Sequence, residues 1–166
     1  LISYNITKEY RNKYKVSSYN GILFNTESYL RPKNFLIPKI CLAAISSDKN
    51  KNKINYFGNL KISREWNWCD EQVKLIWKFL QKKPQDFLLS NGRIFTAKEM
   101  LTFAFEYLNL DYRKFIKISN AFKRPKDITF AKSNLQKQFK NDYKIYGKKL
   151  ITKLIKFYIN NNYDYK

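Results

Sequence analysis

The stretch Asn20-Gly21-Ile22-Leu23-Phe24-Asn25-Thr26-Glu27-Ser28 decides the fold class of this chain. Its apolar run, Ile22 to Phe24, closes a strand that we expect to cover Val16–Phe24. The run is continuous rather than alternating, as in a strand that is covered on both faces. Polar residues follow at once, and a loop is expected over Asn25–Lys33. The stretch therefore predicts a buried strand between layers of helix.

Helices and strands are expected to alternate along the rest of the chain. The clearest helix is at 69–83, where apolar residues recur at helical spacing and a proline ends the pattern. These residues are Val73, Ile76, Trp77, Leu80 and Pro84. The first helix, 3–14, has an apolar side of Tyr4, Ile6, Tyr10 and Tyr14. Thr96 and Glu99 form a capping box that begins another helix, with Ala97, Leu101, Ala104 and Leu108 facing inward. Further helices are expected at 34–47, 133–139 and 148–160, and strands at 54–57, 86–89 and 113–118. This alternation predicts an α/β fold with parallel strands.

The composition bounds the function without fixing it. The chain has 166 residues, of which 44% are hydrophobic and 17% aromatic, so it is expected to fold. Thirty-three basic residues against 13 acidic ones give a net charge of +20. That charge fits a nucleic-acid binder, a site for an anionic small molecule such as a nucleotide sugar, or a biased composition. The basic residues are scattered along the chain, which favours the last of these.

Several classes of site are excluded by the residues that are absent. Histidine is lacking and there are only two cysteines, which excludes Ser-His-Asp and Cys-His catalysis and most zinc sites. The four glycines lie far apart, so no glycine-rich phosphate cradle is expected. No apolar run has the length of a membrane span and no secretory signal is visible, so a cytoplasmic location is expected. The chain begins at Leu1, and we expect it to be a piece of a longer protein.

A second informative stretch runs from Tyr56 to Trp66. It predicts a short strand, a turn at Gly58-Asn59, and an arginine, Arg64, just before a helix. An arginine in that position presents a planar charged fork that suits a diphosphate. The stretch resembles the Gly-Asn-Leu-x-x-x-Arg-Asp-Trp segment of GDP-mannose 4,6-dehydratases, which are nucleotide-sugar enzymes of the extended short-chain dehydrogenase/reductase family. Glu65 stands where the family has aspartate, and the sequence after Trp66 departs from the family pattern.

Residues 20–28 are similar to the family's Asn-Gly-Ile-Leu-Phe-Asn-His-Glu-Ser segment. The resemblance implies that Asn25 contacts the substrate diphosphate and that Arg31 contacts NADP. Thr26 replaces a histidine that lies at the cofactor, and Lys39 falls in a helix start that forms a wall of the nucleotide site. Without the resemblance, Asn25 would be a strand-end residue bonded to its own backbone. Arg31 and Lys39 would be solvated surface residues.

Arg124-Pro125-Lys126-Asp127 resembles the family's Arg-Pro-x-Glu motif. The resemblance implies that Arg124 binds the diphosphate and that Asp127 accepts hydrogen bonds from the ribose hydroxyls. The alternative is a solvated Arg-Pro turn.

The resemblance runs from about Ile6 to Asn160 and implies the C-terminal part of a Rossmann-like parallel sheet plus a small mixed α/β substrate-binding domain. The cofactor domain would comprise 1–28 and 66–90, and the nucleotide-sugar domain 29–65 and 91–166. The full-length family converts GDP-mannose to GDP-4-keto-6-deoxymannose with bound NADP. Its Tyr-x-x-x-Lys pair would precede Leu1, so no catalytic residue is expected in this chain and the chain alone is expected to be inactive.

The expected partner is a nucleotide sugar, with a homo-oligomer for the full-length protein and no nucleic acid, membrane or metal. Two other functions stay open: another extended-family epimerase or reductase, and a basic nucleic-acid-binding module. The module would use interleaved aromatic and basic residues, namely Lys114, Phe115, Lys117, Phe122, Lys123 and Arg124. A third reading places the basic helix at 148–158 on a membrane or partner surface, against simple docking on the core.

Overall fold

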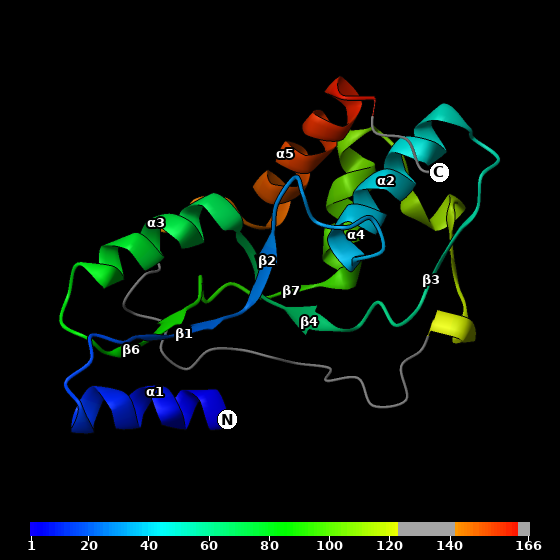
Figure 1. Ribbon diagram of the computed structural model, residues 1–166. Helices are drawn as coiled ribbons and strands as arrows, with labels where there is room; N and C mark the ends of the chain where they lie inside the picture. The colour runs from blue at the N-terminus through cyan, green and yellow to red at the C-terminus, as the bar shows by residue number, and fades with distance from the viewer. Residues whose placement is uncertain (123–141, 163–166) are drawn as a thin grey trace.

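The computed structural model describes residues 1–122 and 142–162, and it has the predicted α/β fold (Figure 1). Its helices are α1 Ile2–Lys13, α2 Leu36–Lys49, α3 Cys69–Leu80, α4 Ala97–Tyr107 and α5 Gly147–Asn160, with short 3₁₀ turns at Tyr112–Lys114 and Asn120–Phe122. Its strands are β1 Asn20–Leu23, β2 Asn25–Glu27, β3 Asn55–Phe57, β4 Ser63–Arg64, β5 Trp66–Trp68, β6 Asp86–Leu89, β7 Phe95–Thr96 and β8 Ile116–Ile118. Three described strand pairs are parallel, namely β1–β6, β2–β5 and β3–β8, and β4–β7 is antiparallel.

The β1–β6 pair lies between two helices (Figure 1). The prediction of a strand buried on both faces is nevertheless wrong for β1, because Gly21, Ile22 and Leu23 are exposed in a sheet of two described strands. On one face, α3 packs through Phe79, whose ring stacks on Phe87 of β6 at 4.3 Å between centroids. On the other face lies α1, which is held by polar contacts to Asp86. Successive strand residues point to opposite faces, so Asp86 contacts α1 and its neighbour Phe87 contacts α3.

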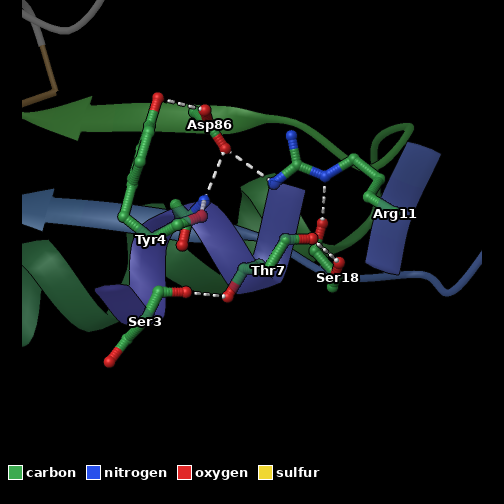
Figure 2. A network of polar contacts seen from close by, with 7 residues as sticks. Ser3, Tyr4, Thr7, Arg11, Ser18 and Asp86 are labelled. Atoms are coloured by element: carbon green, nitrogen blue, oxygen red, sulfur yellow. Dashed lines mark hydrogen bonds and ion pairs between the residues drawn. The ribbon is translucent and has the colours of Figure 1, made fainter. Parts of the chain in front are cut away.

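Helix α1 buries none of its side chains, which corrects its predicted apolar side. Ile6, Tyr10 and Tyr14 are exposed. The helix is attached instead through the Asp86 carboxylate (Figure 2). Tyr4 donates its hydroxyl hydrogen to Asp86 Oδ2 at 2.6 Å, and Arg11 donates from a terminal guanidinium nitrogen to Oδ1 at 2.6 Å.

Further hydrogen bonds complete this attachment. Asn20 of β1 donates from its side-chain amide to Asp86 Oδ1 at 2.9 Å. Arg11 Nε donates to the Ser18 carbonyl at 2.9 Å, and the Ser18 hydroxyl donates to the Thr7 carbonyl at 3.2 Å (Figure 2). Hydrogen bonds to charged groups are stronger than neutral ones, so this network replaces the missing apolar face.

The buried side of α3 differs from the prediction. Val73, Trp77 and Leu80 are exposed, with Trp77 at 66%, whereas Gln72, Leu75 and Phe79 are the residues buried in the core. Both sides of this helix carry apolar residues, and periodicity alone does not say which side meets the rest of the chain. Ile22 and Leu23 of β1 are also about half exposed, at 48% and 46%. Ile22, Leu23 and Trp77 therefore form exposed apolar surface in this part of the chain.

The larger core lies where α2, α4 and α5 pack together. Helix α2 is buried almost along its whole length, from Ile37 to Ile45. Helix α4 contributes its predicted inner face, with Ala97, Leu101 and Ala104 fully buried. The Thr96–Glu99 capping box is also confirmed: Glu99 N donates to Thr96 Oγ1 at 3.1 Å and Thr96 N donates to Glu99 Oε2 at 2.7 Å. A smaller core joins α3 and β6 through Leu75, Phe79, Phe87, Leu89 and Tyr143.

Several predicted boundaries are corrected. The strand expected over Val16–Phe24 is shorter and is followed by a second strand, β2, where a loop was expected. Residues 113–118 begin as a 3₁₀ turn and become a strand only at Ile116. Helix α3 ends at Leu80, four residues before the proline, and the helix expected at 133–139 lies outside the described residues.

Across residues 1–122 and 142–162, no helix combines the length and the apolar character that crossing a membrane requires. The division into two domains stays a prediction.

Candidate functional site

A cavity of about 410 Å³ opens beside β2, the start of α2, the turn after β3, and β4. Four of the seven predicted site residues line it: Asn25, Arg31, Lys39 and Arg64. They come from separate parts of the chain, and only the folded structure brings them together. Ligands of open parallel sheets bind beyond the carboxyl ends of the strands. Asn25 lies just beyond the end of β1, at Leu23, so the cavity has that position.

The alternation of β2 decides which of its residues face the cavity. Asn25 and Glu27 line it, whereas Thr26 points to the other side. There the Thr26 hydroxyl donates to Gln72 Oε1 of α3 at 2.6 Å. The structure therefore does not bring Thr26 into the cavity with the other predicted residues.

Lys39 is fixed at the cavity wall by α2 and β3. Its ammonium donates to the Tyr56 carbonyl at 2.9 Å and lies 4.7 Å from the Phe57 ring centroid and 4.2 Å from that of Phe122. Partial burial lowers the pKa of Lys39. These contacts hold the Lys39 ammonium on an apolar wall. Its electrostatic attraction for an anionic ligand is stronger there than it would be in water.

Arg31 lies over the ring of Phe35, with 3.8 Å between the guanidinium carbon and the ring centroid. Its Nε is 3.9 Å from Glu27 Oε1, which is too long for a hydrogen bond. The stacking fixes the guanidinium plane, and a fixed plane favours two-point binding of a phosphate.

Arg64 is positioned by one strand pairing and one hydrogen bond of its side chain. It pairs with Phe95 of β7, and one of its terminal nitrogens donates to the Ser63 carbonyl at 2.9 Å. Trp66, two residues on, also lines the cavity and is 3% exposed, so it serves mainly as core. Between them, Glu65 points away from the cavity into the loop that follows β6. The Ser90 hydroxyl donates to Glu65 Oε2 at 2.6 Å, which holds that loop against the strand carrying Arg64.

Glu27 is a charged cavity residue to which the sequence analysis assigned no role. Its side chain is 2% exposed, and its Oε2 has no hydrogen-bond partner among the described residues. Burial raises the pKa of Glu27 to about 7, against the lowering effect of the Arg31 charge. Strand alternation was the available signal, since any residue two positions after Asn25 shares its face.

The close approach of Phe122 to Gly58 explains why a glycine begins the turn after β3. A Cβ built at this position would lie 2.5 Å from the Phe122 carbonyl oxygen, which is closer than atoms can approach. The turn can therefore bring Phe122 and Phe57 together as one wall of the cavity only with glycine at this position.

Two predicted site residues, Arg124 and Asp127, lie outside the described residues. Thr26, Arg31 and the remaining predicted contacts keep their assigned roles as predictions. The chain's four glycines lie far apart in the sequence, so the described residues contain no glycine-rich loop of the kind that holds a dinucleotide. Among the described residues, no group of three or more histidine, cysteine, aspartate or glutamate side chains is placed to hold a metal ion.

The sequence comparisons point to one family. The family model described as GDP-mannose 4,6 dehydratase matches residues 1–147. The protein described as GDP-mannose 4,6 dehydratase 1 of Arabidopsis thaliana is 32% identical over 132 residues, which cover 79% of this chain and 37% of that protein. The GDP-mannose 4,6 dehydratase of Dictyostelium discoideum is 28% identical and is covered over 52% of its length by 98% of this chain. The chain thus spans about a third to a half of the length of these relatives.

Solved structures agree on the fold. The dTDP-glucose 4,6-dehydratase of Bacillus anthracis, solved in complex with NAD, has a TM-score of 0.77 at 14% identity, covering 96% of this chain and 50% of that one. The UDP-N-acetylglucosamine 4-epimerase of Methanobrevibacter ruminantium has a TM-score of 0.73 at 18% identity, covering 95% and 51%. At this level of identity the similarity establishes the Rossmann-like fold alone.

Proposed function

Since this chain belongs to the GDP-mannose 4,6-dehydratase family, we propose that it supplies the nucleotide-sugar-binding part of a 4,6-dehydratase acting on GDP-mannose. The observation that carries the proposal is the cavity lined by Asn25, Arg31, Lys39 and Arg64. Three cations and one amide from four separate segments converge on a space of about 410 Å³. That volume lies within the range of small-molecule sites, and the charge suits a diphosphate.

Each residue has a proposed part in holding the ligand. Arg64 and Lys39, which come from β4 and α2, bind the diphosphate oxygens, and Asn25 donates from its side-chain amide. Arg31, stacked on Phe35, is proposed to contact the NADP phosphate or ribose, as the family resemblance implies. Arg124 and Asp127 stay proposed contacts to the diphosphate and the ribose.

The proposed reaction of the whole protein is an internal redox dehydration that uses bound NADP. The cofactor supplies the hydride chemistry when it is bound, and its cradle is proposed to lie outside this chain. Thr26 would be a cofactor contact only if its hydroxyl turned away from Gln72. We therefore propose that the 166 residues alone bind the nucleotide sugar but do not turn it over. The full-length protein is proposed to be a homo-oligomer.

The proposal is tested by titrating the 166-residue chain with GDP-mannose, UDP-glucose and dTDP-glucose in a calorimeter. GDP-mannose is expected to bind most tightly. Arg64→Ala removes a charge-assisted contact and is expected to weaken binding about 10- to 100-fold. Arg113→Ala is the matched control, because that arginine is 77% exposed, pairs with its near neighbour Asp111 and lies outside the cavity.

The results separate the alternatives. Equal affinity for all three nucleotide sugars would point to another enzyme of the extended family. Equal loss of binding in both arginine variants would contradict the assignment of this cavity. Binding of DNA that weakens steeply with added salt, with no binding of nucleotide sugar, would support a nucleic-acid module instead.

A further inference from the structure

Glu27 is a buried carboxyl group at the wall of the proposed phosphate-binding cavity. Its side chain is 2% exposed, and Oε2 has no hydrogen-bond partner among the described residues. The nearest cation, Arg31 Nε, is 3.9 Å from Oε1 and also lacks a hydrogen-bond partner. Buried polar atoms in folded proteins are almost always paired. Two buried atoms without hydrogen-bond partners, side by side at a cavity, therefore indicate that a ligand supplies those hydrogen bonds.

The chemistry of that ligand conflicts with an ionised Glu27. A diphosphate held by Arg31, Lys39 and Arg64 would place negative charge beside the carboxylate in a space with little water. Like charges at close range destabilise each other, and the group that can take up a proton does so. A carboxylic acid, in contrast, donates its O–H to a phosphate oxygen.

We propose that Glu27 is a further ligand-binding residue that holds the diphosphate of a nucleotide sugar as a carboxylic acid, so that the ligand binds together with one proton. The inference rests on the proposed function of the cavity. The proton comes from solvent and stays on Glu27, whose O–H donates to a phosphate oxygen, and no covalent bond of the ligand changes. Arg31, which Glu27 no longer attracts as an anion, is then available to the ligand.

The surroundings of Glu27 support this assignment. Burial already raises its pKa to about 7 without a ligand. The charged and titratable groups that face it are Arg31 from the following loop, Lys39 and Cys41 from α2, and Arg64 from β4. The two guanidinium groups stay charged, and burial raises the pKa of Cys41, so its thiol stays neutral. Lys39, whose pKa burial lowers, is the other group here that can exchange a proton.

The test is calorimetric titration of the 166-residue chain with GDP-mannose from about pH 5.5 to about pH 9, in pairs of buffers with different ionisation enthalpies. Both phosphates of this ligand are diesters and stay singly charged throughout. The guanine N1–H begins to ionise only at the alkaline end of this range, so proton counts are compared below it, where protein groups alone set them. The wild-type chain is expected to take up close to one proton at about pH 8 and none at about pH 5.5. Its affinity is expected to fall up to tenfold for each pH unit above neutrality.

Glu27→Gln keeps a hydrogen-bond donor without a charge. It is expected to bind as tightly at about pH 8.5 as the wild type does at about pH 6, with no proton uptake. A proton taken up by Lys39 would persist in this variant. Glu106→Gln changes an exposed carboxylate outside this cavity and is expected to keep the wild-type pH dependence. Circular dichroism and a thermal midpoint at about pH 6 establish that each variant is folded.

Three results would overturn the inference. Wild-type binding without proton uptake would leave the proposed function standing and remove the role of Glu27. A loss of affinity in Glu27→Gln at every pH would make Glu27 an ionised acceptor instead. Failure of the folded wild-type chain to bind GDP-mannose at any pH would refute the proposed function and this inference together.

Discussion

Replacing Asp86 with asparagine is expected to release α1 from the rest of the chain. The helix has no buried side chain, so its attachment depends mainly on the hydrogen bonds that Tyr4 and Arg11 direct at the Asp86 carboxylate. Asn20 of β1 holds the same carboxylate in place. Asparagine has nearly the same shape but no charge and only one acceptor oxygen. The change therefore removes the charge-assisted part of the network and leaves the β6 backbone unaltered.

The magnitude follows from the ionisation of Asp86. Burial opposes ionisation, but the hydrogen bonds from Tyr4, Arg11 and Asn20 and the Arg11 charge outweigh it and lower the pKa of Asp86 from 3.8 to about 2. A lowering of that size corresponds to ~2.4 kcal/mol. A quarter of the side chain is exposed to solvent, and screening reduces the contribution to ~1–2 kcal/mol. The stabilisation is present above the unfolded pKa of 3.8 and is lost as the pH falls through about 2.

Amide hydrogen exchange followed by mass spectrometry measures this effect element by element. In Asp86→Asn at neutral pH, the amides of α1 are expected to exchange ~5- to 30-fold faster, while those of α4 keep their protection. Asp142→Asn is the matched control, because Asp142 forms an exposed ion pair with Lys78 whose loss costs less than ~1 kcal/mol. Unchanged exchange of α1, or an equal increase in α4, would refute the reasoning that this network alone attaches the helix.

Three further predictions concern stability and the cavity wall. Glu27→Gln is expected to stabilise the chain by ~3 kcal/mol at about pH 8 and by little at about pH 4. The reason is that the folded pKa of Glu27 is raised from 4.5 to about 7, so the stability of the wild-type chain falls as the pH rises across that interval. Urea unfolding at the two pH values measures the effect, and parallel pH profiles in the two proteins would contradict it. Gly147→Ala is expected to cost ~2 kcal/mol or more in urea unfolding, since this residue has φ +50° and its new Cβ would lie 2.6 Å from the Phe95 ring; an unchanged midpoint would show that α5 begins without that strain. Gly58→Ala would place a Cβ 2.5 Å from the Phe122 carbonyl oxygen and is expected to weaken GDP-mannose binding at least ~10-fold while the far-ultraviolet spectrum is retained; wild-type affinity would mean that this wall does not touch the ligand.

Local sequence signals predicted most of the elements but not their burial. The capping box at Thr96 and Glu99 was predictable because both partners lie within one turn of helix. The buried side of α3 was not, because Val73 and Trp77 have the same helical spacing as Leu75 and Phe79. Strand β2 was also missed, since three residues that end in Glu27 have the composition of a loop and become a strand only by pairing with β5.

The sequence by itself determined the family, the α/β class and the identity of Asn25, Arg31, Lys39 and Arg64 as candidate ligands. It did so because short motifs and hydrophobic periodicity are properties of neighbouring residues. Only the tertiary structure decided that these four line one cavity while Thr26 turns to Gln72, and that a buried carboxyl group, Glu27, lies among the cations. The physical reason is that proximity between distant segments, and the loss of water around a charge, arise when strands pair and helices pack, and no local pattern encodes them.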